Sequence, residues 1–206
     1  YARNKYTSDG GYLPYAAWVT FNTEDPAGSF TELSRGGVEF YEAAYDGELI
    51  YGLDIDNNFY SVNPETFEST LIGSISDTAN SMTYDWEHDT FYIVNSNLQI
   101  RELRKDGSLG SAITPANVVC IAPVTYVGNG EFLSLDFNTR NYVRIAADGS
   151  TTHLAHSDGL QGWSSSMVYN REDGKCYICY TNMQNGDDTS SVGFWGKLFA
   201  IDPVTG

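Results

Sequence analysis

The sequence is poor in cysteine and contains no apolar stretch long enough to span a membrane. Its three cysteines, Cys120, Cys176 and Cys179, are odd in number and irregularly spaced, which excludes a disulfide framework. Cys176 and Cys179 stand three residues apart in an apolar segment with the character of a strand, so their side chains would face opposite sides. The sequence therefore predicts buried free thiols, and it predicts no direct insertion into a membrane.

Basic residues are scarce as well. Lys and Arg together number 11 against 27 Asp and Glu, and the formal net charge is −16. Such a field repels phosphate backbones and anionic membrane surfaces, so a nucleic acid is not expected as a partner. The acidity then has two interpretations: it keeps the protein in solution, or some of its loops bind divalent cations.

Long runs of Ala, Glu, Lys and Leu are also missing, which argues against helices. The sequence is instead rich in aromatic residues and glycine, with 15 Tyr, 10 Phe and 20 Gly among 206 residues. Aromatic residues favour strands, and glycine favours turns. We therefore expect an all-β protein that is long enough to bury a core without metals or disulfides.

A repeat of about 40 residues runs through most of the chain. Its first segment occurs four times, as Glu42–Asp46, Ser81–Asp85, Pro123–Val127 and Ser166–Asn170. The fourth residue of each copy is a tyrosine, at positions 45, 84, 126 and 169, and these tyrosines are 39, 42 and 43 residues apart. Each copy continues with a polar turn, a second apolar strand, a third alternating strand and a tight turn, and three copies add a polar fourth strand. This spacing is typical of the blades of a β-propeller, whereas a β-sandwich would not repeat aligned residues at this period.

The repeat describes residues 1–206 as a single propeller domain or a fragment of one. We expect a half blade at 15–34, where Trp18–Asn22 aligns with a third strand, and blades at 39–73, 81–113, 118–156 and 164–206. Two strands are then left over at the N-terminal end and three at the C-terminal end, one too many for a single shared blade. About four to five blades should therefore be visible, in a ring that closes irregularly or continues beyond residue 206, and we favour continuation.

The third strand of the last repeat runs into Asp202-Pro-Val-Thr-Gly206, and an inner segment reads Ser81-Met-Thr-Tyr-Asp85. This pattern resembles the propeller-like repeat region of large secreted and surface proteins of Bacteroidota, over residues 15–206. It lacks the Gly-His and Trp-Asp signature of WD40 blades and the double glycines of kelch blades. The resemblance implies a secreted or cell-surface location in a bacterium and a binding or scaffolding role, and it supplies no catalytic residues.

The last repeat carries a long insertion between its second and third strands, within residues 180–195. Insertions in a repeat protein gather on one face, often the binding face, and the equivalent loop of an earlier blade is 54–58. The predicted ligand-binding residues of this shared rim are Asp54, Asp56, Trp163, Asp187, Asp188 and Trp195. Carboxylates and aromatic rings suit a cation, a cationic peptide or a sugar. We therefore expect an extracellular protein or carbohydrate partner, with a plain surface loop as the alternative.

One segment of that rim has the oxygen-rich pattern of a calcium loop. Asp54, Asp56 and Asn58 alternate, and Glu65 stands where a bidentate carboxylate would fall. Phe59 occupies the position where the sharp turn of such a loop needs glycine, and an Asp/Asn hairpin turn explains the same residues. We expect no cofactor, with calcium as the alternative.

No catalytic arrangement stands out in the sequence. His153 and His156 would face opposite sides of a strand, and His88 lies in a polar turn, so neither a metal triad nor a nucleophile relay is indicated. The recurring tyrosines indicate packing between blades before they indicate a ligand cage. The sequence therefore favours a non-catalytic extracellular binding or scaffolding module, with a glycoside hydrolase or lyase on a propeller scaffold as the alternative.

Overall fold

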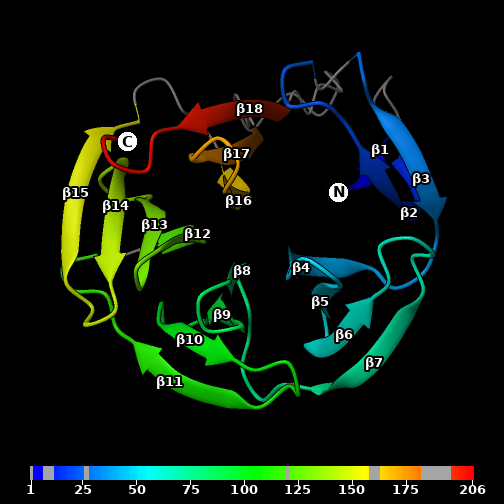
Figure 1. Ribbon diagram of the computed structural model, residues 1–206, viewed down its shortest axis with the longest axis horizontal. Coiled ribbons are helices and arrows are strands. Elements are labelled where there is room, and N and C mark those ends of the chain that lie inside the picture. Colours follow the sequence, from blue (N-terminus) through cyan, green and yellow to red (C-terminus); the bar gives the residue numbers. More distant parts are fainter. Residues whose placement is uncertain (1, 7–11, 26–27, 119–120, 158–162, 182–195) are drawn as a thin grey trace.

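The computed structural model describes residues 2–6, 12–25, 28–118, 121–157, 163–181 and 196–206. In these residues all regular structure is β, and eighteen strands form five antiparallel sheets that stand around a common axis (Figure 1). The β-propeller predicted from the repeat is confirmed. Over the described part of the chain, no helix has the length and the apolar character that a bilayer crossing requires.

The strands follow one another along the chain from sheet to sheet. The first sheet contains β1 (Ala2–Tyr6), β2 (Tyr12–Thr20) and β3 (Thr31–Arg35), and the second contains β4 (Phe40–Tyr45), β5 (Ile50–Asp54), β6 (Asn58–Val62) and β7 (Ser69–Ser74). The third contains β8 (Met82–Asp85), β9 (Thr90–Val94), β10 (Ile100–Leu103) and β11 (Leu109–Ile113). The fourth contains β12 (Ile121–Gly128), β13 (Glu131–Asp136), β14 (Asn141–Ala146) and β15 (Thr151–His156), and the fifth contains β16 (Trp163–Asn170), β17 (Lys175–Thr181) and β18 (Gly196–Ile201).

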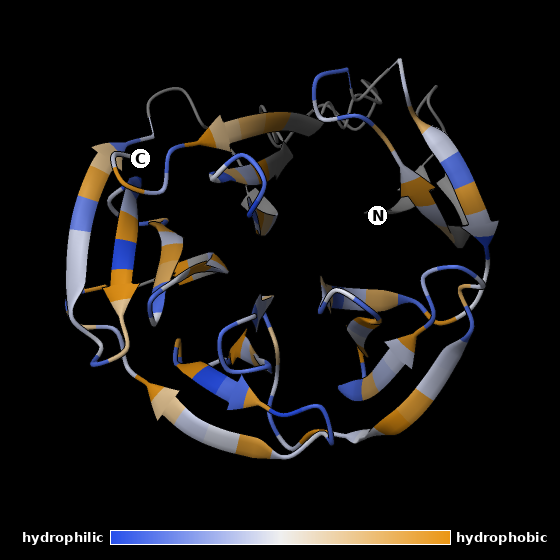
Figure 2. Cartoon of the chain, in the orientation of Figure 1, coloured by the Kyte–Doolittle hydropathy of each residue, from blue (hydrophilic) through white to orange (hydrophobic). Residues whose placement is uncertain are grey.

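In each four-stranded sheet the first strand is the innermost and the fourth lies on the outer rim (Figure 1). The second strand is buried almost throughout, as in β13, because neighbouring blades cover both of its faces. The fourth strand is largely exposed, as in β7 and β15, which explains its polar sequence. Figure 2 shows hydrophobic residues concentrated on the strands and hydrophilic ones mostly in the turns.

The turn between the third and fourth strands packs against the preceding blade. In the fourth sheet this turn contains Gly149, whose φ is +83° and whose added Cβ would lie 2.5 Å from the carbonyl oxygen of Thr114. The Gly149 carbonyl accepts a hydrogen bond from the N–H of Ala116 at 2.8 Å, just beyond β11. At the C-terminal turn, the Thr205 carbonyl accepts one from Ala155 in β15 at 3.1 Å. Only glycine meets both the conformation and the contact at position 149.

Apolar side chains fill the spaces between neighbouring blades. Between the second and third sheets, Phe59 packs edge-on against Phe91, and Tyr51 lies 4.8 Å from Phe91 between ring centroids. Comparable clusters join the third to the fourth sheet and the fourth to the fifth. Tyr126 belongs to one of these clusters, and Tyr84 and Tyr169 pack against others, as expected for recurring positions between blades.

The first sheet is built differently from the others. Trp18 in β2 packs on Ile50 and Val62 of the second sheet and stacks on Phe67, much as Phe59 packs on the third sheet. This packing is equivalent to that of a third strand, so β2 takes the third position of a blade and β3 the fourth. The strand β1, which the sequence did not predict, pairs with β2 and takes the second position. Among the described residues, no strand occupies the innermost position of this sheet.

Candidate functional site

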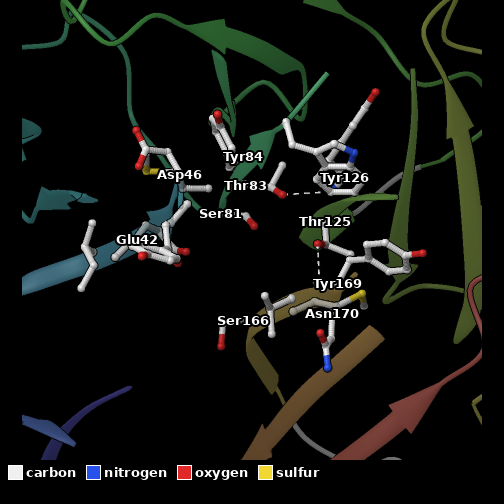
Figure 3. A pocket seen from close by; sticks show the side chains of 18 of the residues that line it. Glu42, Asp46, Ser81, Thr83, Tyr84, Thr125, Tyr126, Ser166, Tyr169 and Asn170 are labelled. Atoms are coloured by element: carbon white, nitrogen blue, oxygen red, sulfur yellow. Dashed lines mark hydrogen bonds between the residues drawn. The ribbon is translucent and has the colours of Figure 1, made fainter. Parts of the chain in front are cut away.

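The inner strands β4, β8, β12 and β16 surround the axis of the ring and line a cavity of about 570 Å³ (Figures 1 and 3). Each of these strands carries one copy of the repeated segment with the tyrosine in its fourth position. The cavity is therefore built from equivalent residues of four blades. Trp18 and Ile50 complete its lining on the side of the first sheet.

The lining is polar at one level and aromatic at the next. Glu42, Ser81 and Ser166 begin the repeated segment in three blades and line the cavity with a carboxyl and two hydroxyl groups (Figure 3). Three residues further along each strand stand the aromatic residues of the lining, Tyr45, Tyr84, Tyr126 and Tyr169. Rings beside hydroxyl groups can hold a ligand that has both an apolar face and hydrogen-bonding groups.

Hydrogen bonds join the inner strands side by side. The N–H of Tyr126 donates to Oγ1 of Thr83 at 2.9 Å, and the N–H of Tyr169 donates to Oγ1 of Thr125 at 3.1 Å (Figure 3). Nearer the start of the strands, the N–H of Val124 donates to Oγ of Ser81 at 3.0 Å. The side chains of β8 and β12 thus accept backbone N–H groups of the inner strand that follows each of them. We call this series of bonds the inner-strand ladder.

Between β4 and β8, the acceptor in the inner-strand ladder is the carboxyl group of Glu42. Its side chain accepts the N–H of Met82, and only 8% of the residue is exposed. Burial raises the pKa of Glu42 well above its ordinary value, and the bond from Met82 opposes this only in part. The raised pKa favours the neutral carboxylic acid, which can donate as well as accept a hydrogen bond.

An aromatic stack stands at the end of the cavity where the first and second strands are joined. Trp86 lies edge-on to Tyr126 at 4.8 Å and is stacked on Tyr169 at 5.5 Å, and the guanidinium of Arg171 lies 5.1 Å from its ring. The Tyr126 hydroxyl donates to Glu87, which also accepts the N–H of Asn129 at 2.9 Å. These contacts tie the turns of three blades together and hold the rings in place.

A charged cluster flanks the same end. Nζ of Lys105 lies 2.8 Å from Asp46 and 2.6 Å from Asp89, and the Tyr84 hydroxyl donates to Asp89 at 2.6 Å. Burial acts to raise the pKa of Asp46, but the bonds from Lys105 and from the N–H groups of Leu49 and Glu48 outweigh it, so this pKa is lowered. Burial, followed by the bond to Asp89, raises the pKa of Tyr84 to about 12. The cluster joins the second and third blades and leaves Asp46 a poor base.

The structure places the residues predicted for the rim in different situations. Asp54 and Asp56 lie in and after the end of β5, outside the cavity lining. The Asp54 carboxylate accepts the N–H groups of Asp56 and Asn58, each at 2.9 Å, as well as the side chain of Asn58. Trp163 begins β16, and its side chain lies outside the described residues, as do Asp187, Asp188 and Trp195. The rim therefore stays a prediction.

The expectation of no cofactor, with calcium at residues 54–65 as the alternative, stays a prediction as well. Among the described residues, the one group of three acids or histidines close enough to share an ion is Asp85, Glu87 and His88. Asp85 already accepts the N–H groups of Glu87 and His88 and lies 2.8 Å from Nδ1 of His88. The contact with Asp85 raises the pKa of His88. These bonds explain the cluster as a turn stabilised by its own side chains.

Sequence reasoning did not single out Glu42, Ser81 or Thr83 as lining residues. A signal was present, because the first strand of a propeller blade faces the axis and these residues belong to that strand in the repeat. Their neighbour Tyr45 differs from the other tyrosines, since 49% of it is exposed whereas Tyr126 is 1% exposed. The fold and the cavity together define a β-propeller protein with a central cavity lined by its inner strands.

The comparisons with known proteins agree with this class. The sequence model of the SdiA-regulated family matches residues 60–183, that is 124 of the 206 residues. The chain belongs to the SdiA-regulated family. No curated protein sequence matches it.

Solved structures share the fold at low sequence identity. A protein of a nidogen/laminin complex is similar with a TM-score of 0.63 at 13% identity, over 93% of this chain and 72% of that one. Glutaminyl cyclase from Myxococcus xanthus gives 0.62 at 14%, over 90% and 80%. An auxiliary nutrient binding protein from Bacteroides thetaiotaomicron gives 0.53 at 16%, over 85% of this chain and 52% of that one. This chain thus spans about half the length of the Bacteroides protein.

Proposed function

We propose that this protein is a non-catalytic binding module of a secreted or cell-surface bacterial protein, and that the central cavity is its binding site. The observation that carries the proposal is the lining of the cavity. Four equivalent strands line a space of about 570 Å³ with tyrosine, serine and threonine side chains and one buried carboxyl, and the lining includes the exposed ring of Tyr45. A volume of this order accommodates a small molecule or a short piece of a larger one.

The chemistry of the lining favours binding over catalysis. Glycoside cleavage uses a pair of carboxyl groups, one of which stays ionised and reactive. Among the residues that the structure describes, the carboxyl groups of the lining are those of Glu42 and Asp46. Asp46 is held by Lys105 and by two backbone N–H groups, and its side chain is 5% exposed. Glu42 accepts a backbone N–H of the next blade, so both groups are engaged in holding the blades together.

The expected partner is an extracellular protein segment or a carbohydrate. Both offer apolar faces for the exposed ring of Tyr45 and polar groups for the exposed Ser166 of the lining. A solved structure with this fold is described as a nutrient binding protein, and another is a glutaminyl cyclase, so the fold itself is compatible with binding and with catalysis. The enzyme alternative is therefore included in the test.

The proposal is tested by screening the protein against soluble polysaccharides and peptides by calorimetry, with product analysis by mass spectrometry. A ligand should bind without being converted. Tyr45→Ala, which removes an exposed ring of the lining, should weaken binding by about tenfold. Tyr41→Ala is the matched control, because Tyr41 is also exposed on β4 but lies outside the lining. Conversion of any ligand, or equal effects of the two substitutions, would overturn the proposal.

A further inference from the structure

The residue that follows the repeated segment of each inner strand differs from blade to blade. It is Gly47 in the second blade, Trp86 in the third, Gly128 in the fourth and Arg171 in the fifth. Gly128 has no side chain to compete with the Trp86 ring, which would lie 3.5 Å from an added Cβ. Trp86 contacts both Tyr169 and Arg171 of the fifth blade. An aromatic ring and a guanidinium therefore meet at one end of the cavity, at a level where the repeat places glycine in two other blades.

Among the described residues that line the cavity, Arg171 is the one with a basic side chain. It is exposed, and no described carboxylate lies within ion-pair distance of its guanidinium, which contacts the Trp86 ring at 5.1 Å. Several other basic side chains contact an acid, namely Arg35, Arg101, Arg104, Lys105 and Arg144. Arg171 thus stands apart in a chain with 27 acidic and 11 basic residues. Its N–H donors are available to an acceptor from outside the chain.

The acids of the described lining do not cancel the charge of Arg171. Asp46 is paired with Lys105, whose Nζ lies 2.8 Å away. Glu42 is 8% exposed, and its raised pKa favours the neutral carboxylic acid. The net charge of −16 acts against an anion, but a Debye length of about 8 Å at physiological ionic strength screens the acids outside the cavity. An anionic group of the ligand would therefore supply the charge that Arg171 lacks as a partner.

The inner strands offer a ligand their side chains and few backbone groups. The N–H groups of Met82, Val124, Tyr126 and Tyr169 are bound by side chains of the preceding inner strand. An extended peptide binds mainly through backbone hydrogen bonds to a strand edge, and the inner-strand ladder occupies these edges. A sugar binds instead through ring faces that stack on aromatic side chains and through its hydroxyl groups. The chemistry of the lining therefore favours a saccharide over a peptide.

We propose that the cavity binds an acidic saccharide, and that the guanidinium of Arg171 binds the carboxylate of one of its uronic acid units. This inference rests on the proposed function, because it names the ligand class of the same cavity. A guanidinium can donate two parallel hydrogen bonds to a carboxylate, which distinguishes an acidic sugar from its neutral counterpart. Trp86 is a positioning residue, because its contact holds the guanidinium at the end of the cavity. Both residues belong to blades whose inner strands the structure describes, so the site involves no part of the first sheet.

The ligand class is tested by calorimetry with trisaccharides of galacturonate, glucuronate and mannuronate, each compared with its methyl ester. The ester keeps the sugar rings and removes the charge. At least one acid should bind, and its ester should bind about tenfold or more weakly, because the charged pair with Arg171 is lost. Acetylated and amidated triglutamate, a peptide of the same charge, should bind more weakly than this acid. The inference is overturned if none of the three acids binds, or if the ester or the peptide binds as tightly as the acid.

The site on the protein is tested by removing the guanidinium. Arg171→Gln should weaken binding of the acid by about tenfold or more and leave binding of its ester unchanged. A merely structural role of Arg171 would weaken both ligands alike, so this contrast identifies recognition of the carboxylate. Arg171→Lys keeps the charge without the planar pair of donors and should restore only part of the affinity.

Arg104→Gln is the matched control for this variant. It removes the same charge from an exposed residue directly after β10, outside the cavity lining, and should leave both affinities unchanged. Thermal unfolding verifies that the variants fold. Equal effects of Arg171→Gln and Arg104→Gln would show that total charge governs binding and would overturn the inference.

The outcomes separate this inference from the proposed function. If a neutral ligand binds in a Tyr45-dependent manner and no acidic saccharide does, the cavity is a binding site for another class of ligand, and the inference falls alone. If an acidic saccharide binds through Arg171 and is then cleaved, the proposed function falls and the ligand class holds. Binding without cleavage that depends on Arg171 and on the carboxylate of the saccharide supports both.

Discussion

The backbone N–H of Tyr126 donates a hydrogen bond to Oγ1 of Thr83 across the boundary between two blades, over 2.9 Å. Both residues are buried, with 1% and 7% of their surfaces exposed, so water cannot replace this bond. The same relationship joins Tyr169 to Thr125. A side chain that accepts a neighbouring backbone is therefore a repeated means of fixing one blade against the next at the edge of the cavity.

Replacing Thr83 by Val should destabilise the protein by about 1–3 kcal/mol, because the shape is kept but the N–H of Tyr126 loses its acceptor. The free energy of unfolding in urea measures the change. Thr70→Val is the matched control, since Thr70 lies exposed on the outer strand β7, and it should have little effect. Similar losses for both variants would contradict a special role for the inner-strand bond.

Replacing Lys105 by Met should lower the stability of the protein at neutral pH. It should also make that stability less dependent on pH in the acid range. Lys105 helps to hold the pKa of Asp46 and of Asp89 below their ordinary values. A carboxyl with a lowered pKa in the folded state contributes stability above the unfolded pKa of about 3.9, and the contribution is lost as the pH falls through the folded value. Thermal midpoints between pH 2 and pH 7 should therefore fall less steeply on acidification for the variant.

Lys175→Met provides the control for that experiment. Lys175 is exposed at the start of β17, and it is not among the described ion pairs. Its removal should leave the acid limb of the stability profile nearly unchanged. If the two substitutions flatten the profile equally, the effect reflects total charge and not the contacts of Lys105.

Replacing Glu42 by Gln should make the protein more stable at neutral and alkaline pH. The pKa of Glu42 is raised in the folded state, so the folded protein binds this proton more tightly than the unfolded chain does. Stability is then lost as the pH rises from the unfolded value of about 4.3 through the folded one. Gln removes this loss and can still accept the N–H of Met82. The thermal midpoints of the Glu42→Gln variant at pH 5 and at pH 8 should lie closer together than those of the wild type. Glu65→Gln, at an exposed turn, is the control and should leave the difference between the two midpoints as it is in the wild type.

Cys176 should resist alkylation in the folded protein. It is a free thiol with no exposed surface, and burial, followed by the charges of Asp173 and Asp202, raises its pKa to about 12. The reactive thiolate is therefore disfavoured at neutral pH. Mass spectrometry after iodoacetamide treatment should find Cys176 unmodified in buffer and modified in denaturant. Modification of Cys176 in buffer at the denatured rate would contradict its burial.

The fold was predictable because the sequence repeats one structural unit of four strands. The spacing of Tyr45, Tyr84, Tyr126 and Tyr169 defines a unit that buries its faces only against copies of itself, and a propeller satisfies this requirement. The free, buried state of Cys176 was predictable for a similar reason, since an apolar strand with no second sulfur on its face offers no partner. The strand β1 was not predictable, because Ala2–Tyr6 carries no copy of the repeat.

The cavity was harder to predict than the fold. Alignment shows which residues are equivalent, but it does not show that Tyr45 is exposed and Tyr126 buried, because this depends on which neighbour each blade has. Acidic residues drew attention to the rim at Asp54, whereas the structure shows its carboxylate occupied by its own turn. Glu42 was overlooked because a single acid in an apolar segment gives no pattern, and only burial makes it chemically distinct.

The turns that pack against the preceding blade also protect the perimeter of the molecule. A fourth strand has no further strand beside it, and such edges invite pairing with other chains. Just beyond β11, Ala116 donates to the carbonyl of Gly149, and in β15 Ala155 donates to that of Thr205, so the outer edge of one blade is closed by the blade that follows it in the chain. At both places, the blade that follows in the sequence thus protects the preceding blade against aggregation. Truncation from the C-terminus would uncover the backbone donor of Ala155 and, once the fourth blade was removed, that of Ala116.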